Sequence, residues 1–395
     1  MTLSLPKRYL APFIREDLKE KMVFLGGPRQ VGKTTLGQYI GTHDYPRFAY
    51  LTWDDRQDRQ NILTGRFEPE IPFIMFDELH KYRHWKNYIK GLYDKQKEHF
   101  RILVTGSARL DLYRRGGDSL MGRYHYFRLH PFSLVEMLNR KLRFEPFTSL
   151  HFEQQTAEMS ELFSSLFTFG GFPEPLIKQS SRTLRRWQNE RIDRIVKEDI
   201  RDVEMIRDLA RLELLTSILP TKVGSLFSLN SLRQDLEVTH KTVMTWVDVL
   251  ERFYYHFRVY PFTATTIKSL RKEPKIYLWD WSQIEDSAVR LENIVASHLL
   301  KFIHFLHDTE GYKTELFYLR DVEQREVDFL VTVNKKPWFA VEVKQTQKEI
   351  APHLSYFGQR LKIPFRYQVI AKEKVDYVQN DVRVMSASKF LGGLI

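Results

Sequence analysis

The chain has 395 residues, a formal net charge of +11 at pH 7 and no cysteine. The lack of cysteine excludes disulfides, thiolate zinc sites and cysteine nucleophiles, and the length favours two or three domains. No apolar run approaches the length of a membrane span, and the first residues lack the apolar stretch of a signal peptide. We therefore expect a cytoplasmic protein with no membrane partner. The positive charge favours a polyanionic partner, above all nucleic acid, although many basic proteins bind only a nucleotide.

A phosphate-binding loop of the form G-x-x-x-x-G-K-[ST] runs from Gly27 to Thr34. It follows the apolar run 22–25, which predicts a buried strand, and it precedes a segment that opens a helix. Glycines permit the loop's N–H groups to turn inward around an anion, and the helix amino terminus adds partial positive charge. The order strand, loop, helix makes a chance glycine-rich turn the poorer interpretation. The predicted ATP-binding residues are Gly27, Pro28, Arg29, Gln30, Val31, Gly32, Lys33, Thr34 and Thr35.

Individual roles follow from the residue types. Lys33 supplies a point charge to the β- and γ-phosphates, and the Thr34 hydroxyl is a predicted Mg²⁺ ligand. The apolar segment 71–76 ends in Asp77 and Glu78, which is the Walker B arrangement. A buried strand here brings Asp77 to the Mg²⁺ shell, and Glu78 orients or deprotonates the attacking water. The alternative is an acidic pair that caps the next helix, and it is the weaker interpretation beside an intact phosphate loop.

A third apolar run, 100–104, precedes Thr105 and Ser107. Either residue is a candidate sensor of the γ-phosphate, or an ordinary loop-opening residue. Arg123 follows this strand and is a candidate catalytic arginine for the nucleotide of a neighbouring subunit, a role that accelerates hydrolysis by about 10³ or more. Such a role implies a homo-oligomer. The sequence does not choose between this residue and its rivals Arg191, Arg194 and Arg201.

The pattern of elements divides the chain into four regions. Residues 1–150 alternate strands and helices, as in a parallel sheet covered by helices, and form the predicted ATPase core. Residues 151–209 have helical periodicity and form a predicted lid or linker. Residues 210–262 resemble a winged helix, with a second helix at 240–250 and an alternating strand at 253–260 as the wing.

The second helix of a winged helix enters the major groove in a DNA reader, with its first residues on base edges. This makes His240, Lys241 and Thr245 candidate base contacts. The alternative is a module that packs against its neighbours or against a partner protein, because helix-turn-helix geometry is also a common packing unit.

The fourth region, 263–395, returns to strands and contains a second cluster of candidates. Glu342 and Lys344 lie two apart on a predicted strand and hence on one face, and Asp328 on the adjacent strand completes a D…E-x-K pattern. Two carboxylates there would bind Mg²⁺, and the lysine would position or activate a water. Glu292, on the preceding helix, is an additional candidate ligand. The alternative is a salt-bridge cluster at a strand edge, because D…E-x-K alone is a weak pattern.

Taken in order, the motifs resemble those of bacterial and archaeal AAA-type ATPases with an AAA_14 core and a DUF4143 C-terminal region. The resemblance implies an α/β fold with an AAA+-like parallel sheet and a helical lid, joined here to the winged-helix-like module and a PD-(D/E)xK-like C-terminal domain. No sensor arginine is recognisable in the lid, which weakens the expectation of a ring. The motifs that carry the resemblance are residues 26–35, 76–81, 105–108, 121–124, 131–136, 170–174, 326–329 and 341–344.

The predicted function is therefore a Mg²⁺-dependent ATPase that couples its nucleotide state to a C-terminal region that binds or cleaves nucleic acid, with DNA as the expected partner. The alternative is a nucleotide-dependent switch that binds a protein partner and retains an inactive nuclease-like fold. A P-loop kinase for a small molecule is disfavoured by the acidic pair and by the large C-terminal region.

Overall fold

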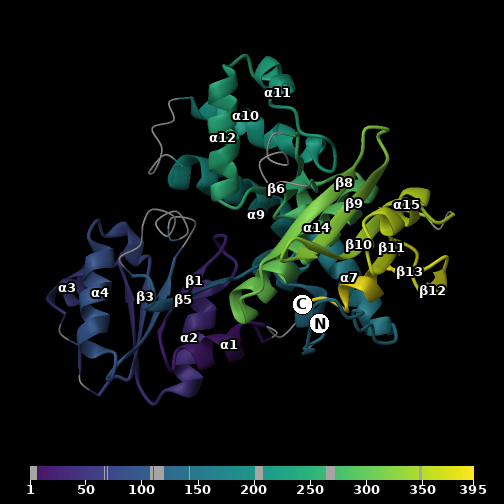
Figure 1. The fold of residues 1–395 in the computed structure, drawn as a ribbon. Coiled ribbons are helices and arrows are strands. Elements are labelled where there is room, and N and C mark those ends of the chain that lie inside the picture. Colours follow the sequence, from purple (N-terminus) through teal and green to yellow (C-terminus); the bar gives the residue numbers. More distant parts are fainter. Residues whose placement is uncertain are drawn as a thin grey trace. The chain divides into compact units, whose positions relative to one another are not determined.

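The computed structural model describes residues 7–65, 67–68, 70–106, 110, 120–141, 143–200, 208–263, 272–346 and 349–395. These residues form two compact units, which we call the N-terminal unit (Lys7–Pro131) and the C-terminal unit (Phe132–Ile395). Each unit is built on its own sheet (Figure 1). The expected combination of a parallel P-loop sheet with a second α/β sheet is confirmed, whereas the finer division at 150, 209 and 262 stays a prediction.

The N-terminal unit contains a five-stranded sheet in the order β2-β3-β4-β1-β5, with every neighbouring pair parallel. Its strands are β1 (Met22–Gly26), β2 (Phe48–Thr52), β3 (Phe73–Asp77), β4 (Arg101–Thr105) and β5 (Tyr124–Arg128). Its helices are α1 (Ala11–Asp17), α2 (Lys33–Asp44), α3 (Arg56–Thr64), the 3₁₀ turn η1 (Leu79–Lys81) and α4 (Trp85–Gln96).

The register of this sheet brings the predicted nucleotide residues to one edge. All residues of β1 and β3 are buried, as expected for parallel strands that helices cover on both faces. Thr105 at the end of β4 pairs with Leu25 of β1 and with Asp77 of β3. The loop after β1, the carboxylate after β3 and the hydroxyl after β4 therefore meet at the carboxyl ends of the strands, where open α/β sheets bind ligands.

The C-terminal unit contains an eight-stranded mixed sheet in the order β12-β13-β11-β10-β9-β8-β6-β7. The pairs β6–β8, β10–β11 and β11–β13 are parallel, and the other neighbours are antiparallel. The strands are β6 (His256–Pro261), β7 (Lys275–Leu278), β8 (Thr314–Arg320), β9 (Glu326–Val333), β10 (Lys336–Lys344), β11 (Phe365–Ile370), β12 (Asp376–Gln379) and β13 (Val382–Ser386).

Helices before the sheet are α6 (Leu134–Met137), α7 (Ala157–Phe169), α8 (Pro173–Lys178), α9 (Ser181–Asp193), the π-helical η2 (Arg194–Ile200), α10 (Leu209–Ile218), η3 (Leu219–Lys222), α11 (Leu229–Asp235) and α12 (His240–Arg252). Those within or after it are η4 (Trp281–Gln283), α14 (Ser287–Glu310), α15 (Pro352–Arg360) and α16 (Ala387–Leu391).

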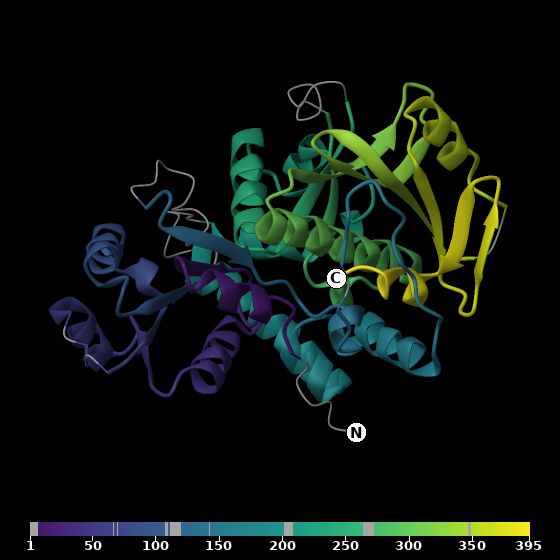
Figure 2. The same ribbon diagram turned by 60° about the horizontal axis from the view of Figure 1, so that its bottom comes forward.

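Two helices cover opposite faces of this sheet, as Figure 2 shows for α14 and α15. Phe302 of α14 contacts the ring of Phe339 on β10. Ala340, the next residue of the strand, shares a hydrophobic cluster with Leu354 of α15. Because neighbouring strand residues point to opposite faces, β10 is buried between two helical layers.

The region predicted to be a winged helix contains α10, α11 and α12 followed by the β6–β7 pair. Thr239 caps α12 by accepting a hydrogen bond from the Thr242 amide at 3.1 Å. The strand predicted to be the wing is β6, and it pairs with β7. Tyr260 and Pro261 also pair with β8, so this strand belongs to the eight-stranded sheet.

Candidate functional site

The phosphate-binding loop leaves β1 in a conformation that requires glycine. Gly27 has a φ of 137°, and a Cβ atom there would lie 2.4 Å from the carbonyl oxygen of Leu129. Gly32 precedes α2 with a φ of 97°, which side chains rarely adopt. Gln30 between them also has a positive φ, of 60°. These backbone angles give the loop the tight turns that an anion nest needs.

Lys33 is held inside this loop and is only 8% exposed. Its Nζ donates hydrogen bonds to the carbonyl oxygens of Gly27 at 3.0 Å and Pro28 at 2.7 Å. These two carbonyl oxygens orient the ammonium group within the loop. The loop therefore presents a fixed positive charge next to backbone N–H donors, which suits a phosphate group.

Asp77 connects the loop to the neighbouring strands. Its Oδ2 accepts hydrogen bonds from the Thr34 hydroxyl at 2.8 Å and the Tyr50 hydroxyl at 3.1 Å, and its Oδ1 accepts one from Thr105 at 2.5 Å. Burial and the Asp77 charge raise the pKa of Tyr50 to about 12, which keeps its phenol a donor. The adjacent Thr34 hydroxyl and Asp77 carboxylate are hard oxygen groups of the kind that Mg²⁺ prefers, so the donor set fits the expected ion.

The two other residues near this edge differ in what they contact. Thr105, a candidate γ-phosphate sensor, donates its hydroxyl to Asp77 and thus fixes that carboxylate; Ser107 lies outside the described residues. Glu78 follows β3 with a left-handed φ of 54°. Its carboxylate lies 3.4 Å from Lys81 Nζ and 3.5 Å from His80 Nε2, so its own neighbours in the chain hold it.

Arg8 is a contact of the loop that sequence reasoning missed. Its Nη1 donates to the carbonyl oxygen of Val31 at 2.7 Å, and its Nη2 donates to that of His130. The side chain is 9% exposed. The partners are 23 and 122 residues away, and no sequence pattern signals such distances. Tyr50 was missed for the same reason, because it reads as an ordinary strand residue.

Arg123 lies at the opposite edge of the sheet from the loop. Its carbonyl oxygen accepts a hydrogen bond from the amide of Met22, at the amino end of β1. Its guanidinium makes two hydrogen bonds to Asp94, at 2.7 and 3.0 Å, and lowers the pKa of that carboxyl. The structure therefore does not bring Arg123 to the loop of its own chain, and a catalytic role would require a second subunit.

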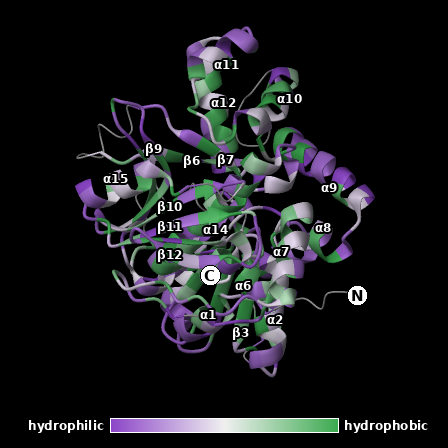
Figure 3. Cartoon of the chain, turned by 90° about the vertical axis from the view of Figure 1, so that its right-hand side faces the viewer, coloured by the Kyte–Doolittle hydropathy of each residue, from purple (hydrophilic) through white to green (hydrophobic). Residues whose placement is uncertain are grey.

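The rival arginines belong to the C-terminal unit. Arg191 lies on α9, a helix of mostly hydrophilic residues (Figure 3), but its own side chain is 3% exposed. Its guanidinium packs 4.7 Å from the ring centre of Phe172 and donates to the Tyr254 carbonyl at 2.9 Å. These contacts inside the C-terminal unit are those of a residue that stabilises the fold. Arg194 is partly exposed and lies 3.8 Å from Glu190. Arg201 lies outside the described residues.

The D…E-x-K residues come together between β9 and β10. Asp328 lies opposite Glu342, and its amide donates to Glu342 Oε2 at 3.2 Å. The Val343 amide donates to Asp328 Oδ2 at 2.9 Å, and Lys344 Nζ lies 2.5 Å from Glu342 Oε1. The sequence pattern thus identified a true spatial cluster. A pocket of about 740 Å³ adjoins it, lined by Glu342, Lys344, Gln345, Thr346, Glu349, Ile350, Ala351, Pro352 and His353.

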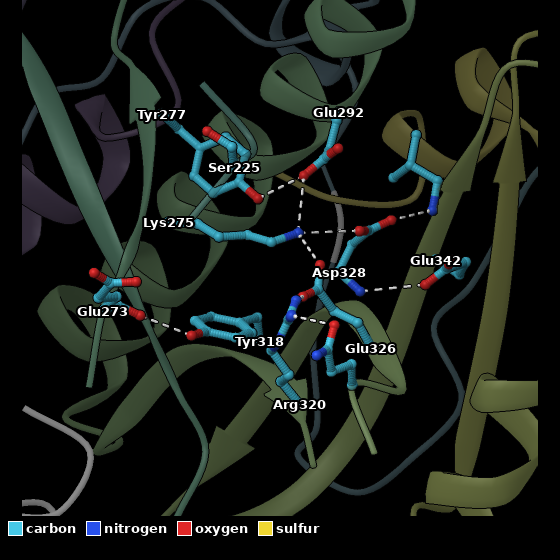
Figure 4. A network of polar contacts seen from close by, with 12 residues as sticks. Ser225, Glu273, Lys275, Tyr277, Glu292, Tyr318, Arg320, Glu326, Asp328 and Glu342 are labelled. Atoms are coloured by element: carbon cyan, nitrogen blue, oxygen red, sulfur yellow. Dashed lines mark hydrogen bonds and ion pairs between the residues drawn. The ribbon is translucent and has the colours of Figure 1, made fainter. Parts of the chain in front are cut away.

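A lysine that the sequence did not single out lies among the carboxylates. Lys275 of β7 places its Nζ 2.6 Å from Glu326, 3.4 Å from Asp328 and 3.5 Å from Glu292 (Figure 4). Tyr277 donates its hydroxyl to Glu292 at 2.7 Å. Within the described residues, no three His, Cys, Asp or Glu side chains are grouped to hold a metal ion. The structure therefore does not assemble Glu292, Asp328 and Glu342 as one ligand set.

Burial dominates the acid–base properties of this cluster. It raises the pKa of Glu292 to about 7 and that of Glu342 to about 8, and the charge of Asp328 adds to both shifts. Lys344 beside Glu342 opposes the second shift. Burial alone would lower the pKa of Lys275, but the surrounding carboxylates outweigh it and raise that pKa. The lysine therefore stays charged.

The candidate base-reading residues lie on the outer side of α12. His240, Lys241 and Thr245 are exposed, whereas Trp246 and Leu250 are buried. Among the helices that the structure describes, none combines the length and apolar composition needed to cross a membrane.

Three family models match successive parts of the chain. The AAA domain model AAA_14 matches residues 19–138. DUF8612 and DUF4143, both domains of unknown function, match residues 160–284 and 290–390.

Relatives match over most of their length. The chain is 24% identical over 374 residues to the uncharacterized protein MJ1544 of Methanocaldococcus jannaschii, with 86% of this chain and 80% of that protein covered. It is 25% identical over 364 residues to the uncharacterized protein Rv2008c of Mycobacterium tuberculosis, with 87% and 75% covered. Among solved structures, RuvB of Thermotoga maritima matches with 16% identity and a TM-score of 0.31, over 67% of this chain and 94% of that chain. The two terminal family matches agree with the motifs in order and position, and they support a P-loop AAA-type ATPase core joined to a DUF4143 C-terminal region.

Proposed function

We propose that this protein is a Mg²⁺-dependent ATPase whose nucleotide state controls nucleic-acid binding by its C-terminal unit. One observation carries the enzymatic half. The Thr34 hydroxyl is hydrogen-bonded to Asp77 at 2.8 Å, beside a loop that holds the Lys33 ammonium on its own carbonyls. A nucleotide-binding P-loop needs this combination of a hard oxygen pair, a fixed cation and an anion nest.

Each residue has a distinct part in this proposal. Thr34 and Asp77 would hold Mg²⁺, which would neutralise phosphate charge. Lys33 binds the β- and γ-phosphates, and Thr105 and Tyr50 keep the Asp77 carboxylate oriented. Glu78 accepts a proton from the attacking water or orients it, after leaving its contacts with Lys81 and His80.

The test of the enzymatic half compares Lys33→Ala with Lys95→Ala. Lys95 is an exposed lysine of α4 in the same unit, so both variants lose one positive charge. We expect Lys33→Ala to lose ATP hydrolysis and to bind a fluorescent ATP analogue much more weakly, with Lys95→Ala at the wild-type level. Wild-type hydrolysis by Lys33→Ala would refute the proposal.

The nucleic-acid half rests on the net charge of +11 and on the exposed face of α12. A helix that binds DNA through phosphates loses affinity steeply with salt, with a log–log slope of about −0.9 per phosphate contacted. We expect duplex binding by the wild type to show such a slope. Lys241→Ala should reduce the slope by roughly one contact, and Lys313→Ala, an exposed lysine outside α12, should leave it unchanged.

The second candidate is a nucleotide-dependent switch that binds a protein through the C-terminal unit. The observation that favours it is Lys275, whose ammonium lies among the carboxylates that a nuclease would use. DNA binding that is absent at low salt, together with intact ATP hydrolysis, would make this candidate the better one.

A further inference from the structure

The C-terminal carboxylate cluster contains its own cation. Lys275 extends from β7 so that its Nζ lies within 3.5 Å of Glu292 on α14 and of Glu326 and Asp328 on β9 (Figure 4). Its side chain is 3% exposed. A buried ammonium is very unfavourable unless paired carboxylates compensate it, so it cannot leave this cluster without unfolding part of the unit.

Five of the six carboxylate oxygens of Asp328, Glu342 and Glu292 already accept hydrogen bonds or contact cations. Asp328 Oδ2 accepts from the Val343 amide and its Oδ1 faces Lys275. Glu342 Oε2 accepts from the Asp328 amide, and its Oε1 contacts Lys344. Glu292 Oε1 accepts from the Tyr277 hydroxyl.

The charges of the cluster are also nearly balanced. Its four carboxylates, when ionised, face three cations. Lys275 contacts three of the carboxylates. Arg320 lies 2.6 Å from Glu326, and Lys344 lies 2.5 Å from Glu342. A divalent ion would add two positive charges a few ångströms from a buried ammonium, and like charges at such distances repel strongly in a poorly solvated site.

We propose that Lys275 is a resident counter-ion that takes the place of a divalent metal in this cluster, so that the C-terminal unit does not cleave nucleic acid by a metal-dependent mechanism. The lysine joins β7, β9 and α14 through its carboxylate partners, which gives the cluster a role in holding the unit together. The proposal concerns the C-terminal unit alone and does not depend on ATP hydrolysis at the P-loop.

The test measures Mn²⁺ binding calorimetrically without nucleotide, on the full chain. We compare the wild type, Asp328→Asn, Lys275→Ala, and the double variant Lys275→Ala/Asp328→Asn. We expect the wild type and Asp328→Asn to give the same titration. Lys275→Ala, which removes the internal cation and leaves its carboxylates unpaired, should gain one Mn²⁺ site that the double variant lacks. Asp381→Asn, whose side chain is 86% exposed, is the control for loss of a carboxylate.

A wild-type Mn²⁺ site that Asp328→Asn abolishes would overturn the proposal. So would Mn²⁺-dependent DNA cleavage by the wild type that disappears in Asp328→Asn and persists in Asp381→Asn. Both outcomes use only conservative variants, so the test stands even if Lys275→Ala does not fold. ATP hydrolysis measured on the same samples separates this result from the fate of the ATPase proposal.

Discussion

Arg8 shows how much of a P-loop's geometry depends on residues outside its motif. Its guanidinium joins the Val31 carbonyl inside the loop to the His130 carbonyl in the segment after β5. A hydrogen bond to a charged group contributes about 1.5–3 kcal/mol. Arg8 therefore stabilises the one loop conformation in which the backbone N–H groups converge, before any phosphate is bound.

Arg8→Ala should weaken ATP binding without changing the fold. We expect the affinity for a fluorescent ATP analogue to fall about tenfold, which corresponds to ~1.4 kcal/mol, because the loop must then be ordered by the ligand itself. The control is Arg15→Ala, which removes a half-exposed arginine paired with Asp44 on the same unit. Equal affinities in the two variants would show that the loop keeps its shape without Arg8.

At the scale of elements, the start of the C-terminal unit is fixed to α14. Lys301 of this helix forms an ion pair with Glu136 of α6, and its Nζ donates to the Ser133 hydroxyl at 2.9 Å. Both charged side chains are nearly fully buried. The amide of Leu134 donates to His298 Nε2 at 3.3 Å, one turn earlier on α14.

Lys301→Met should destabilise the C-terminal unit strongly, because it leaves the Glu136 carboxylate buried without its cation. Removal of one partner of a buried pair costs about 3–5 kcal/mol. We expect the urea midpoint of unfolding to fall accordingly, and the double variant Lys301→Met/Glu136→Leu to regain part of the loss, since no buried charge then remains. A midpoint unchanged in Lys301→Met would mean that water reaches Glu136.

His298 should make the contact between α6 and α14 sensitive to acid. Burial lowers its pKa to about 3, and its Nδ1 contacts the Ile294 carbonyl at 2.8 Å while Nε2 accepts from Leu134. The unfolded chain takes up a proton at His298 near pH 6.5, and the folded state does not. The contribution of neutral His298 to the free energy of unfolding is therefore complete above that pH and is lost as the pH falls.

Unfolding free energies at pH 7 and pH 5 test this expectation. The decrease between the two should be smaller in His298→Gln than in the wild type, because the variant has no group to titrate at that position. His307→Gln, on the same helix with its side chain 49% exposed, should retain the wild-type decrease. An equal decrease of the unfolding free energy in all three proteins would contradict the assignment of this pH dependence to His298.

Elements differ in how well their sequences predict them. The continuous apolar runs of β1, β3 and β4 marked buried parallel strands, and the strands that carry Asp328 and Glu342, β9 and β10, were likewise predicted. β5 was missed because His125 and Arg128 interrupt its apolar pattern. β6 was predicted as the wing of a winged helix. Its additional pairing with β8 joins Tyr260 to Phe317 across a sequence separation that no local pattern encodes.

The same limit applies to the candidate sites. Motif spacing predicted Lys33, Thr34 and Asp77, which are brought together at the carboxyl ends of β1 and β3, the two parallel strands on either side of β4. It also predicted that Asp328 and Glu342 lie together. It did not predict Lys275, because a lone lysine at the start of a strand has no motif, and its carboxylate partners lie on β9 and α14, further along the chain.

At the scale of the whole molecule, residues 129–132 cross the boundary between the two units and are hydrogen-bonded on each side of it. On the N-terminal side, the Leu129 amide donates to the Gly26 carbonyl at 2.9 Å, at the start of the phosphate loop, and Arg8 holds His130. On the C-terminal side, the Phe132 amide donates to the Gly171 carbonyl at 2.7 Å. The proposed control by ATP would therefore act through this segment, because it contacts the phosphate loop on one side and leads into the C-terminal unit on the other.

If this connection couples the two units as proposed, ATP and DNA must affect each other's binding equally. Any factor by which ATP changes the affinity for duplex DNA must equal the factor by which DNA changes the affinity for ATP. Glu78→Gln, which should bind ATP without hydrolysing it, permits both affinities to be measured at equilibrium. We expect the two factors to agree and to lie at about 5-fold or more, the lower range of typical coupling.

Arg8→Ala should reduce both factors together, because it frees the connecting segment from the loop. In contrast, Arg15→Ala should preserve them. Factors of one in Glu78→Gln would mean that the units bind their ligands independently. The phosphate loop would then serve a function other than control of the C-terminal unit, even with ATP hydrolysis intact.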